Sequence, residues 1–323
     1  MAPNHPLAGG VRVLILAATV EQGVAMDGVA EQSQFAAQEF DAVERIDGPN
    51  SHALVICDHA SNAFPPGYGA LGLPPEALQR HIAYDIGAAW LARKLAALLE
   101  APALLSTYSR LLIDPNRGED DPTLVMRYSD GAIVPGNARA DAREIERRRR
   151  LYWAPYREAV HASVEAMQAA GTSPALVSIH SFTPVWRGVP RPWKVAVLWD
   201  ADPRLAEPLI SALRAEPDIG PDEVGDNEPY DGALMGDTIY DAATTRGLSN
   251  ALIEVRQDLI ATQPEAEAWA ERLARLIRPL IAPDAARARR NFGTRSHAHA
   301  LTPRLHPGMA RHPLGSQRSN TDG

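Results

Sequence analysis

Cysteine is nearly absent from this sequence, with Cys57 as the single example in 323 residues. One cysteine forms no disulfide within the chain and excludes a zinc site built from several thiolates. Long apolar runs are also lacking, because residues 11–20 form an apolar stretch of only about ten residues and a membrane span needs about 20. We therefore expect a protein of a reducing compartment, the cytoplasm, with no membrane partner.

The sequence also has fewer positively than negatively charged residues. Its formal net charge is -8, and aromatic residues make up only 6%. An acidic chain lacks the electrostatic footprint of a nucleic-acid binder, so we expect no nucleic-acid partner. An anionic substrate must then be held by a few well-placed arginines, whereas the oligomeric state cannot be read from the composition.

Composition divides the chain into three parts. Residues 1–36 are rich in Ala, Gly, Val and Gln without a sustained period, which indicates a flexible N-terminal extension or a signal segment. Residues 285–323 collect Arg, His, Pro and Ser with few large apolar side chains, which favours a disordered tail. The folded catalytic domain is expected over residues 37–284.

Within that body, short apolar runs alternate with longer helical patterns, and this predicts an α/β fold. The sheet should be mixed and mainly parallel, with flanking helices and with ligands at the carboxyl ends of its strands. The expected strands are residues 53–57, 103–107, 111–113, 175–179, 194–199 and 251–255. The expected helices are residues 75–100 in two stretches, 141–167, 203–215 and 264–281.

Polar clusters accompany four of the apolar strands. They are Asp58-His59-Ala60-Ser61-Asn62, then Ser109-Arg110 with Asp114-Pro115-Asn116-Arg117, then His180-Ser181, and finally Glu254 with Arg256. Each cluster alone is weak evidence, because histidines beside strands are often structural. Together they supply imidazoles to hold a metal and a carboxylate to take a proton from water, which is the set that a metal-dependent hydrolase needs.

Five segments carry a resemblance to a known family. The segments CDHASN, YSRLLIDPNR, SIHSF, GDNEPYDG and LIEVRQDL occur in this order over residues 57–259. In this they resemble the N-formylglutamate amidohydrolases, which are in turn similar to zinc carboxypeptidases and aspartoacylases. The resemblance implies a zinc-carboxypeptidase-like, phosphorylase/hydrolase-like fold and a divalent metal ion, Zn²⁺ being expected.

The resemblance also implies roles for particular residues. His59 and His180 match the two metal histidines, and Glu254, in a Glu-x-Arg strand, matches the catalytic glutamate. Asn116 and Arg117 match an Asn-Arg pair that grips a substrate carboxylate. Arg110 stands where a substrate or oxyanion arginine is expected.

One position departs from the family pattern. Asn62 occupies the place of a metal-binding glutamate, three residues after His59. Two candidates for the third metal ligand therefore stay open, Asn62 itself and Asp85. A degenerate member that binds a ligand without catalysis is a third reading of the same departure.

The expected reaction is the hydrolysis of N-formyl-L-glutamate to formate and L-glutamate. Arg110 and Arg117 can take the α-carboxylate and the developing oxyanion, because planar guanidinium groups bind carboxylates in a bidentate way. Arg256 or Arg187 is then left for the side-chain carboxylate, and Tyr230 can donate a hydrogen bond to the acyl group. The alternative substrate is another N-acyl amino acid or small amide.

Overall fold

A computed structural model describes residues 40–296, which belong to one compact unit. The expected extension over residues 1–36 and residues 297–323 of the expected tail lie outside the described part. Residues 285–296 are described, and Arg295 there contacts the main body through the carbonyl oxygens of Trp199 and Asp200. Within residues 40–296, no helix combines the length and apolar character that crossing a membrane requires.

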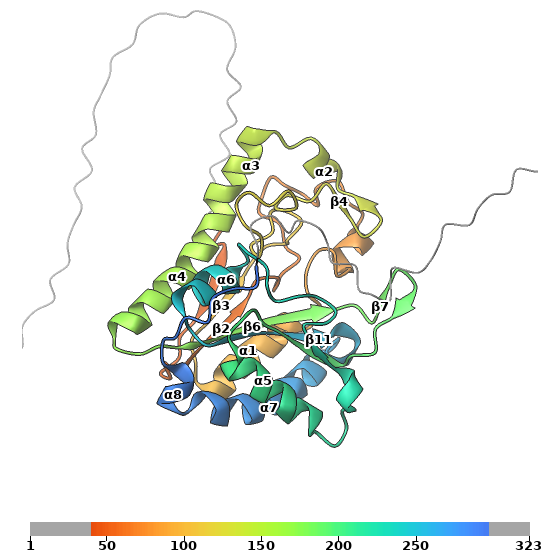
Figure 1. The fold of residues 1–323 in the computed structure, drawn as a ribbon. Helices are drawn as coiled ribbons and strands as arrows, with labels where there is room; N and C mark the ends of the chain where they lie inside the picture. The colour runs from red at the N-terminus through yellow and green to blue at the C-terminus, as the bar shows by residue number, and fades with distance from the viewer. Residues whose placement is uncertain (1–39, 297–323) are drawn as a thin grey trace, which may run out of the picture. The chain divides into compact units, whose positions relative to one another are not determined.

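A seven-stranded mixed sheet forms the centre of the fold, with the strand order β1-β3-β2-β6-β11-β9-β10. Neighbouring strands are parallel except in the pairs β1/β3 and β11/β9, so the expected mainly parallel sheet is confirmed (Figure 1). The strands are β1 (Val43–Ile46), β2 (Ala53–Cys57), β3 (Ala103–Ser106), β6 (Ala175–Phe182), β9 (Val195–Leu198), β10 (Val224–Asp226) and β11 (Asn250–Arg256).

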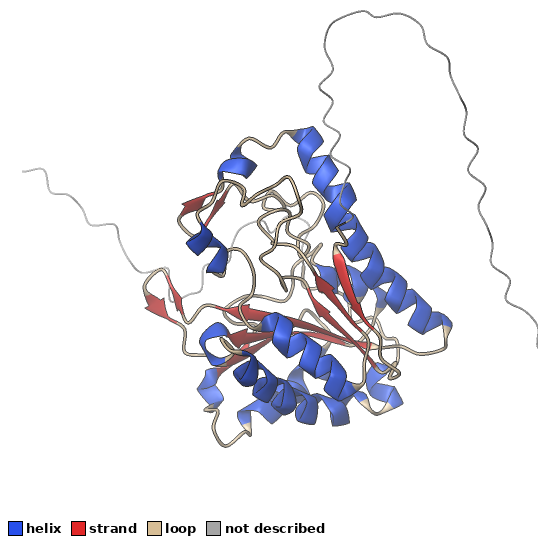
Figure 2. Ribbon diagram, turned by 180° about the vertical axis from the view of Figure 1, so that it is seen from behind, coloured by secondary structure: helices blue, strands red, loops and turns tan. Residues whose placement is uncertain are grey.

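Helices cover both faces of this sheet, as Figures 1 and 2 show. One face packs against α1 (Ala88–Leu99), α5 (Pro203–Arg214) and α7 (Gln263–Ile281). The other face packs against long loops and a nearly continuous helical segment. That segment comprises α3 (Ala142–Arg148), the π-helical turn η2 (Arg149–Trp153) and α4 (Ala154–Ala169), and α6 (Thr238–Ala242) lies beside it.

The helical layer under the sheet forms because its apolar side chains recur at helical spacing. Leu91, Leu95 and Leu99 lie on one side of α1 and are at most 2% exposed. They share one core with Leu273 and Ile277 of α7. Burying each such side chain contributes about 1.5–3 kcal/mol, which makes this layer the rigid base on which the strand ends are held.

Two local predictions were wrong. The first half of the helix expected over residues 75–100 is a short 3-10 turn, η1 (Pro75–Gln79), followed by loop up to the start of α1 at Ala88. Residues 111–113 form a turn rather than a strand, and they are fully buried against the loops of the second face. In both places apolar side chains are buried in a core, but the backbone does not form the regular hydrogen bonds of a helix or a strand.

Small elements complete the described chain. Two exposed two-stranded hairpins are β4 (Tyr128–Ser129) with β5 (Ala132–Ile133), and β7 (Val185–Trp186) with β8 (Val189–Pro190). The remaining elements are short helices and 3-10 turns, namely α2 (Pro135–Ala138), η3 (Pro221–Glu223), η4 (Thr244–Arg246), η5 (Gln257–Leu259) and α8 (Asp284–Arg287).

Gly87 fixes the path of the loop that replaces the expected helix. Its φ is 81°, and a Cβ atom there would meet the carbonyl oxygen of Ile260 at 2.0 Å. Left-handed backbone costs other L-residues about 1–2 kcal/mol, and the close approach adds a steric clash. Only glycine lets this loop return tightly into α1, and Asp85 lies two residues before that return.

We predict that Gly87→Ala destabilises the protein by about 2 kcal/mol or more beyond the cost of Gly131→Ala. Gly131 is the matched control because its φ is 80° and nothing lies within 4 Å of an added Cβ. Gly131→Ala therefore reports the backbone strain alone, about 1–2 kcal/mol, whereas Gly87→Ala adds the clash. Denaturant unfolding of both variants measures the difference, and equal losses would contradict this role of Gly87.

Candidate metal centre and active site

The ends of three parallel strands bring the predicted site residues together. His59 follows β2, while His180 lies in β6 and Glu254 in β11. Glu254 is the register partner of His180, so the two side chains occupy neighbouring positions on adjacent strands. The sheet register thus places an imidazole and a carboxylate side by side, although they are distant in the sequence.

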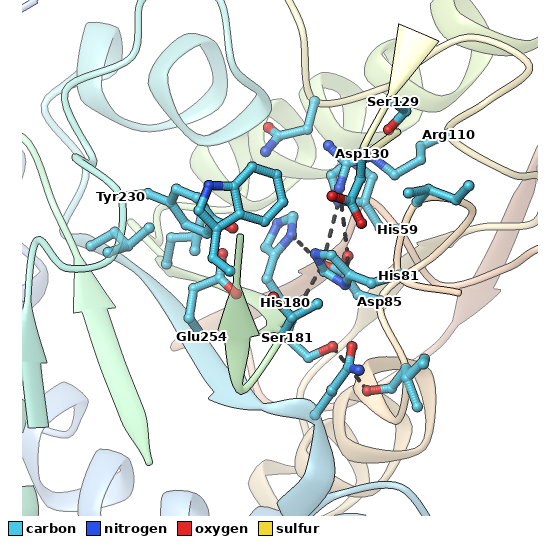
Figure 3. Close-up of a pocket in the computed structure, with 18 of the residues that line it drawn as sticks. His59, His81, Asp85, Arg110, Ser129, Asp130, His180, Ser181, Tyr230 and Glu254 are labelled. Carbon is cyan, nitrogen blue, oxygen red and sulfur yellow. Dashed lines mark hydrogen bonds and ion pairs between the residues drawn. The ribbon is translucent and has the colours of Figure 1, made fainter. Parts of the chain in front are cut away.

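Two imidazoles converge on one carboxylate. The Nδ1 atoms of His59 and His180 lie 3.4 and 2.9 Å from the same oxygen, Oδ2 of Asp85. The ring centroids of the two histidines are 4.9 Å apart, and all three residues are at most 3% exposed. Figure 3 shows the three side chains meeting in the floor of a pocket.

Each imidazole is held on its other side by a further buried carboxylate. His59 Nε2 is 2.7 Å from Oδ1 of Asp114, and His180 Nε2 is 3.0 Å from Oδ2 of Asp58. Since an ionised carboxylate only accepts hydrogen bonds, each Nε2 carries a proton, and each Nδ1 can become a metal ligand once it gives up the proton that it shares with Asp85. This pairing of carboxylate and histidine is typical of the surroundings of protein metal sites.

The electrostatics of the cluster favour a positive charge at its centre. Burial would raise the pKa of Asp85, but the neighbouring imidazoles hold it well below its ordinary value. Burial would lower the pKa of His180, but hydrogen bonds to Asp58 and Asp85 raise it well above the ordinary value. The cluster therefore holds either protons or another cation between the Nδ1 atoms and Asp85.

The donor set fits a divalent metal ion. His59, Asp85 and His180 each offer one ligand atom, and these atoms lie within 4.8 Å of one another. Two imidazole nitrogens and one carboxylate oxygen are the ligands of many catalytic zinc sites, which leave a further position open. Asp85 also has a second buried oxygen, Oδ1, that no hydrogen bond satisfies within the described residues. The group can thus hold a cation.

Glu254 lies next to this group, and part of its buried carboxyl group lacks a hydrogen bond within the described chain. Its side chain is 6% exposed, lines the pocket, and has one buried oxygen, Oε2, without a hydrogen-bond partner in the described chain. Burial raises the pKa of Glu254 to about 7, although the nearby imidazoles oppose that shift. A carboxyl group with such a pKa both accepts and releases a proton near neutral pH.

The pocket above the cluster has a volume of about 480 Å³, which lies within the range of small-molecule sites. Arg117, Asn116 and Tyr230 line it, as expected from the sequence. Arg117 makes no ion pair within residues 40–296, and its Nη1 donates to the carbonyl oxygen of Asn116 at 2.9 Å. Asn116 accepts from the backbone N–H of Thr238 at 2.9 Å, which fixes the orientation of its amide.

Arg110 connects the two halves of the cluster. Its Nε and Nη2 donate to Oδ2 of Asp114 at 3.2 and 2.8 Å, and its Nη1 lies 3.6 Å from Oδ1 of Asp85. The guanidinium therefore supports both the carboxylate that holds His59 and the carboxylate at the centre. Nη1 is the group of Arg110 that remains closest to the candidate metal ligands.

Three residues that the sequence suggested do not reach the pocket. Asn62 donates through Nδ2 to the carbonyl oxygen of Leu78, at 2.9 Å. Arg256 pairs with Asp258 and donates to the carbonyl oxygens of Arg191 and Trp193. Arg187 lies in the turn between β7 and β8, over the Trp186 ring. None of the three lines the cavity. Of the two candidates for the third metal ligand, the geometry favours Asp85.

Sequence reasoning missed several residues around the site. Asp58 and Asp114 were quoted in motifs without the role of holding His180 and His59, although the Asp-His pair 58–59 was visible. His81 lies 3.5 Å from Oδ1 of Asp85, and burial lowers its pKa to about 4. Asp237 is the N-cap of α6 and lines the pocket. No sequence pattern distinguished these last two from ordinary loop residues.

The family match, together with this fold, makes the protein a hydrolase of the amidohydrolase type. The model of the N-formylglutamate amidohydrolase family matches residues 51–261, and the chain belongs to this family. The gene product Atu2144 of Agrobacterium tumefaciens is 33% identical, with a TM-score of 0.70 over 76% of this chain and 96% of that one.

A second solved structure has the same fold. The N-formylglutamate amidohydrolase of Ralstonia eutropha JMP134 is 21% identical, with a TM-score of 0.56 over 74% of this chain and 99% of that one. At this identity the likeness supports the fold alone. No curated protein sequence gave a significant match.

We predict that Asp58→Asn weakens divalent-metal binding about 10–100-fold, because the amide holds His180 less firmly than the carboxylate does. Asp130→Asn is the matched control, since Asp130 lines the same pocket but pairs with Arg80 at 2.8 Å. Competition with a chelator measures both affinities. Unchanged metal affinity in Asp58→Asn would show that its carboxylate does not support a metal ligand.

A pH-dependent stability is expected from Asp237. Burial raises its pKa to about 7, although the backbone N–H of Tyr240 opposes the shift. A folded-state pKa above the ordinary value means that the protonated form stabilises the fold, and that this contribution disappears as the pH rises from about 4 to about 7.

Asp237→Asn should remove this dependence while keeping the helix cap. The variant should gain stability over the unchanged protein as the pH rises through that window, by up to about 4 kcal/mol at about 1.4 kcal/mol per pKa unit. Denaturant unfolding from pH 4 to pH 8 tests this. A stability difference that stays constant with pH would contradict the buried, protonated state of Asp237.

Proposed function

We propose that this protein is a metal-dependent hydrolase of small N-acyl amino acids, and that N-formyl-L-glutamate, the compound in the family's name, is one candidate substrate. The observation that carries the proposal is the convergence of His59, Asp85 and His180, with Glu254 as the register partner of His180. Family membership independently supports amide hydrolysis.

His59, Asp85 and His180 would hold the divalent ion, for which Zn²⁺ is the candidate because of its preference for nitrogen and carboxylate ligands. When bound, such an ion polarises the amide carbonyl and makes a water molecule more acidic. Asp114 and Asp58 keep the two imidazoles in the tautomer that presents Nδ1 to the ion. Imidazole must lose its Nδ1 proton to become a ligand, so metal binding is coupled to proton release.

Glu254 is the proposed general base. Its carboxylate takes a proton from the attacking water and passes it to the leaving amide nitrogen, which departs as the free amine. The position of Glu254 beside His180 supports this role, because His180 is a candidate ligand of the ion that would bind the carbonyl. Its pKa near 7 suits both halves of the transfer, because the group must be a base first and an acid afterwards.

Substrate positioning is proposed for the other lining residues. The guanidinium of Arg117 takes the α-carboxylate, and the amide of Asn116 adds a neutral hydrogen-bond donor beside it. Nη1 of Arg110 lies near the ligand cluster and can donate to the developing oxyanion. The Tyr230 hydroxyl accepts from Nη2 of Arg191 at 3.1 Å, so its own proton is free to donate to the acyl group.

A different N-acyl amino acid is the second candidate substrate. The number of free arginines in the pocket favours it. Formylglutamate has two carboxylates, but Arg117 is the one lining arginine without an ion pair in the described chain. A panel of N-formyl, N-acetyl and N-succinyl amino acids separates the two candidates.

Glu254→Gln should lower kcat about 10²–10⁴-fold on the best substrate of that panel while the free energy of unfolding is kept or raised. The amide cannot take a proton from water, and it removes a carboxyl group that burial disfavours. Glu271→Gln, on the exposed side of α7, is the control and should retain full turnover. Turnover in Glu254→Gln equal to that of the control would refute the mechanism.

A further inference from the structure

The charges that line the pocket leave one guanidinium for a substrate. Of the lining arginines, Arg80 pairs with Asp130 at 2.8 Å and Arg110 pairs with Asp114 at 2.8 Å. Arg117 is the third, and it makes no ion pair within the described chain. A planar guanidinium binds one carboxylate at full strength, in bidentate geometry. The pocket thus offers a strong partner for a single carboxylate.

A fourth arginine lies behind the wall of the pocket rather than in it. Arg191 is 8% exposed, is absent from the lining, and packs against the rings of Phe182, Trp186 and Tyr230 at 5.1–5.7 Å. Its Nη1 donates to Thr183 and its Nη2 to the Tyr230 hydroxyl. At this point the pocket is therefore lined by the neutral hydroxyl of Tyr230 and not by a cation.

Acidic groups face the same space. Asp231 and Glu254 both line the pocket. Asp231 pairs with Arg295 at 3.0 Å, whereas Glu254 makes no ion pair within the described chain. Two like charges about 4 Å apart repel by about 1 kcal/mol in water and by about 4 kcal/mol at the effective dielectric constant of a protein surface. The candidate metal ion does not offset this repulsion, because it would lie at the reacting carbonyl, where the negative charge of Asp85 opposes its own.

Part of the remaining lining is apolar. Leu198 and Leu252 are register partners on β9 and β11, and both line the pocket, together with Trp186 and Leu234. Leu234 is 38% exposed, which places this wall next to solvent. An uncharged group loses little when it leaves water for such a wall, whereas a carboxylate without a partner loses its hydration.

We infer that, within the N-acyl amino acids of the proposed function on which this inference rests, the preferred substrate has one carboxylate, bound by Arg117, and an uncharged side chain that lies against the wall of Trp186, Leu198, Leu234 and Leu252. N-formyl-L-glutamate, with its second carboxylate, is then a weaker substrate than its uncharged isostere, N-formyl-L-glutamine.

The matched pair of compounds tests this directly. N-formyl-L-glutamine and N-formyl-L-glutamate differ by one charge at nearly constant shape, and we expect kcat/KM to be at least about 10-fold higher for the glutamine compound, mainly through KM. Equal values, or a preference for the glutamate compound, overturn the inference and leave the proposed amide hydrolysis intact. Absence of hydrolysis across the whole panel of acyl amino acids instead overturns the proposed function and the inference with it.

Binding to the metal-loaded Glu254→Gln protein gives a measurement that does not depend on turnover. Calorimetric titration should still show a lower dissociation constant for N-formyl-L-glutamine than for N-formyl-L-glutamate, because this variant lacks the charge of Glu254 but keeps Arg117 as its one lining arginine without an ion pair in the described chain. In the same titration, Arg117→Gln should raise the dissociation constants of both compounds by a similar factor, because both compounds have the α-carboxylate. Tighter binding of the glutamate compound would contradict the inference.

Adding a cation to the apolar wall should reverse the preference. Leu234→Arg places a guanidinium at the exposed edge of the pocket, and Leu234→Gln is the uncharged control of similar reach. We expect the ratio of kcat/KM for the glutamate compound over the glutamine compound to be at least about five-fold higher in Leu234→Arg than in Leu234→Gln. An identical ratio in the two variants would show that missing positive charge does not set the preference.

Discussion

Three buried carboxylates around two imidazoles are the constraint on which this structure depends. Asp58, Asp85 and Asp114 are at most 2% exposed, and each would cost several kcal/mol if it were buried as an unpaired charge. His59, His180 and Arg110 offset that cost through direct contacts. The positive charge that remains to be supplied lies between the Nδ1 atoms and Asp85, where a metal ion fits.

The fold serves this cluster by holding its members on rigid elements. The parallel strands β2 and β6 end at the same edge of the sheet, and β11 adds Glu254 in register with His180. Asp85 comes instead from a loop, but that loop is fixed by its backbone N–H bond to the carbonyl oxygen of His59 and by the tight return at Gly87. The cluster is thereby preorganised, which is what electrostatic catalysis requires.

Much of this arrangement could be predicted from the sequence, and the failures have physical reasons. The buried strands read as apolar runs, and His59, His180 and Glu254 were identified by their motifs and lie together in the structure. The turn at residues 111–113 resembled a strand because its side chains are as apolar and as buried as those of one. Asn62 and Arg256 come three and two residues after the candidate site residues His59 and Glu254, but their side chains bind backbone carbonyl or carboxylate partners outside the pocket. Tertiary contacts decide which partner each of these side chains binds, and a local sequence pattern does not contain that information.

The central claim is that one metal ion occupies the space between His59, Asp85 and His180. Crystals of protein loaded with Zn²⁺ and measured at the zinc absorption edge test it most directly. The account predicts one strong anomalous peak about 2.0–2.2 Å from Nδ1 of both histidines and from a carboxylate oxygen of Asp85. A peak elsewhere, or hydrogen-bonded imidazoles with no peak between them, would contradict it.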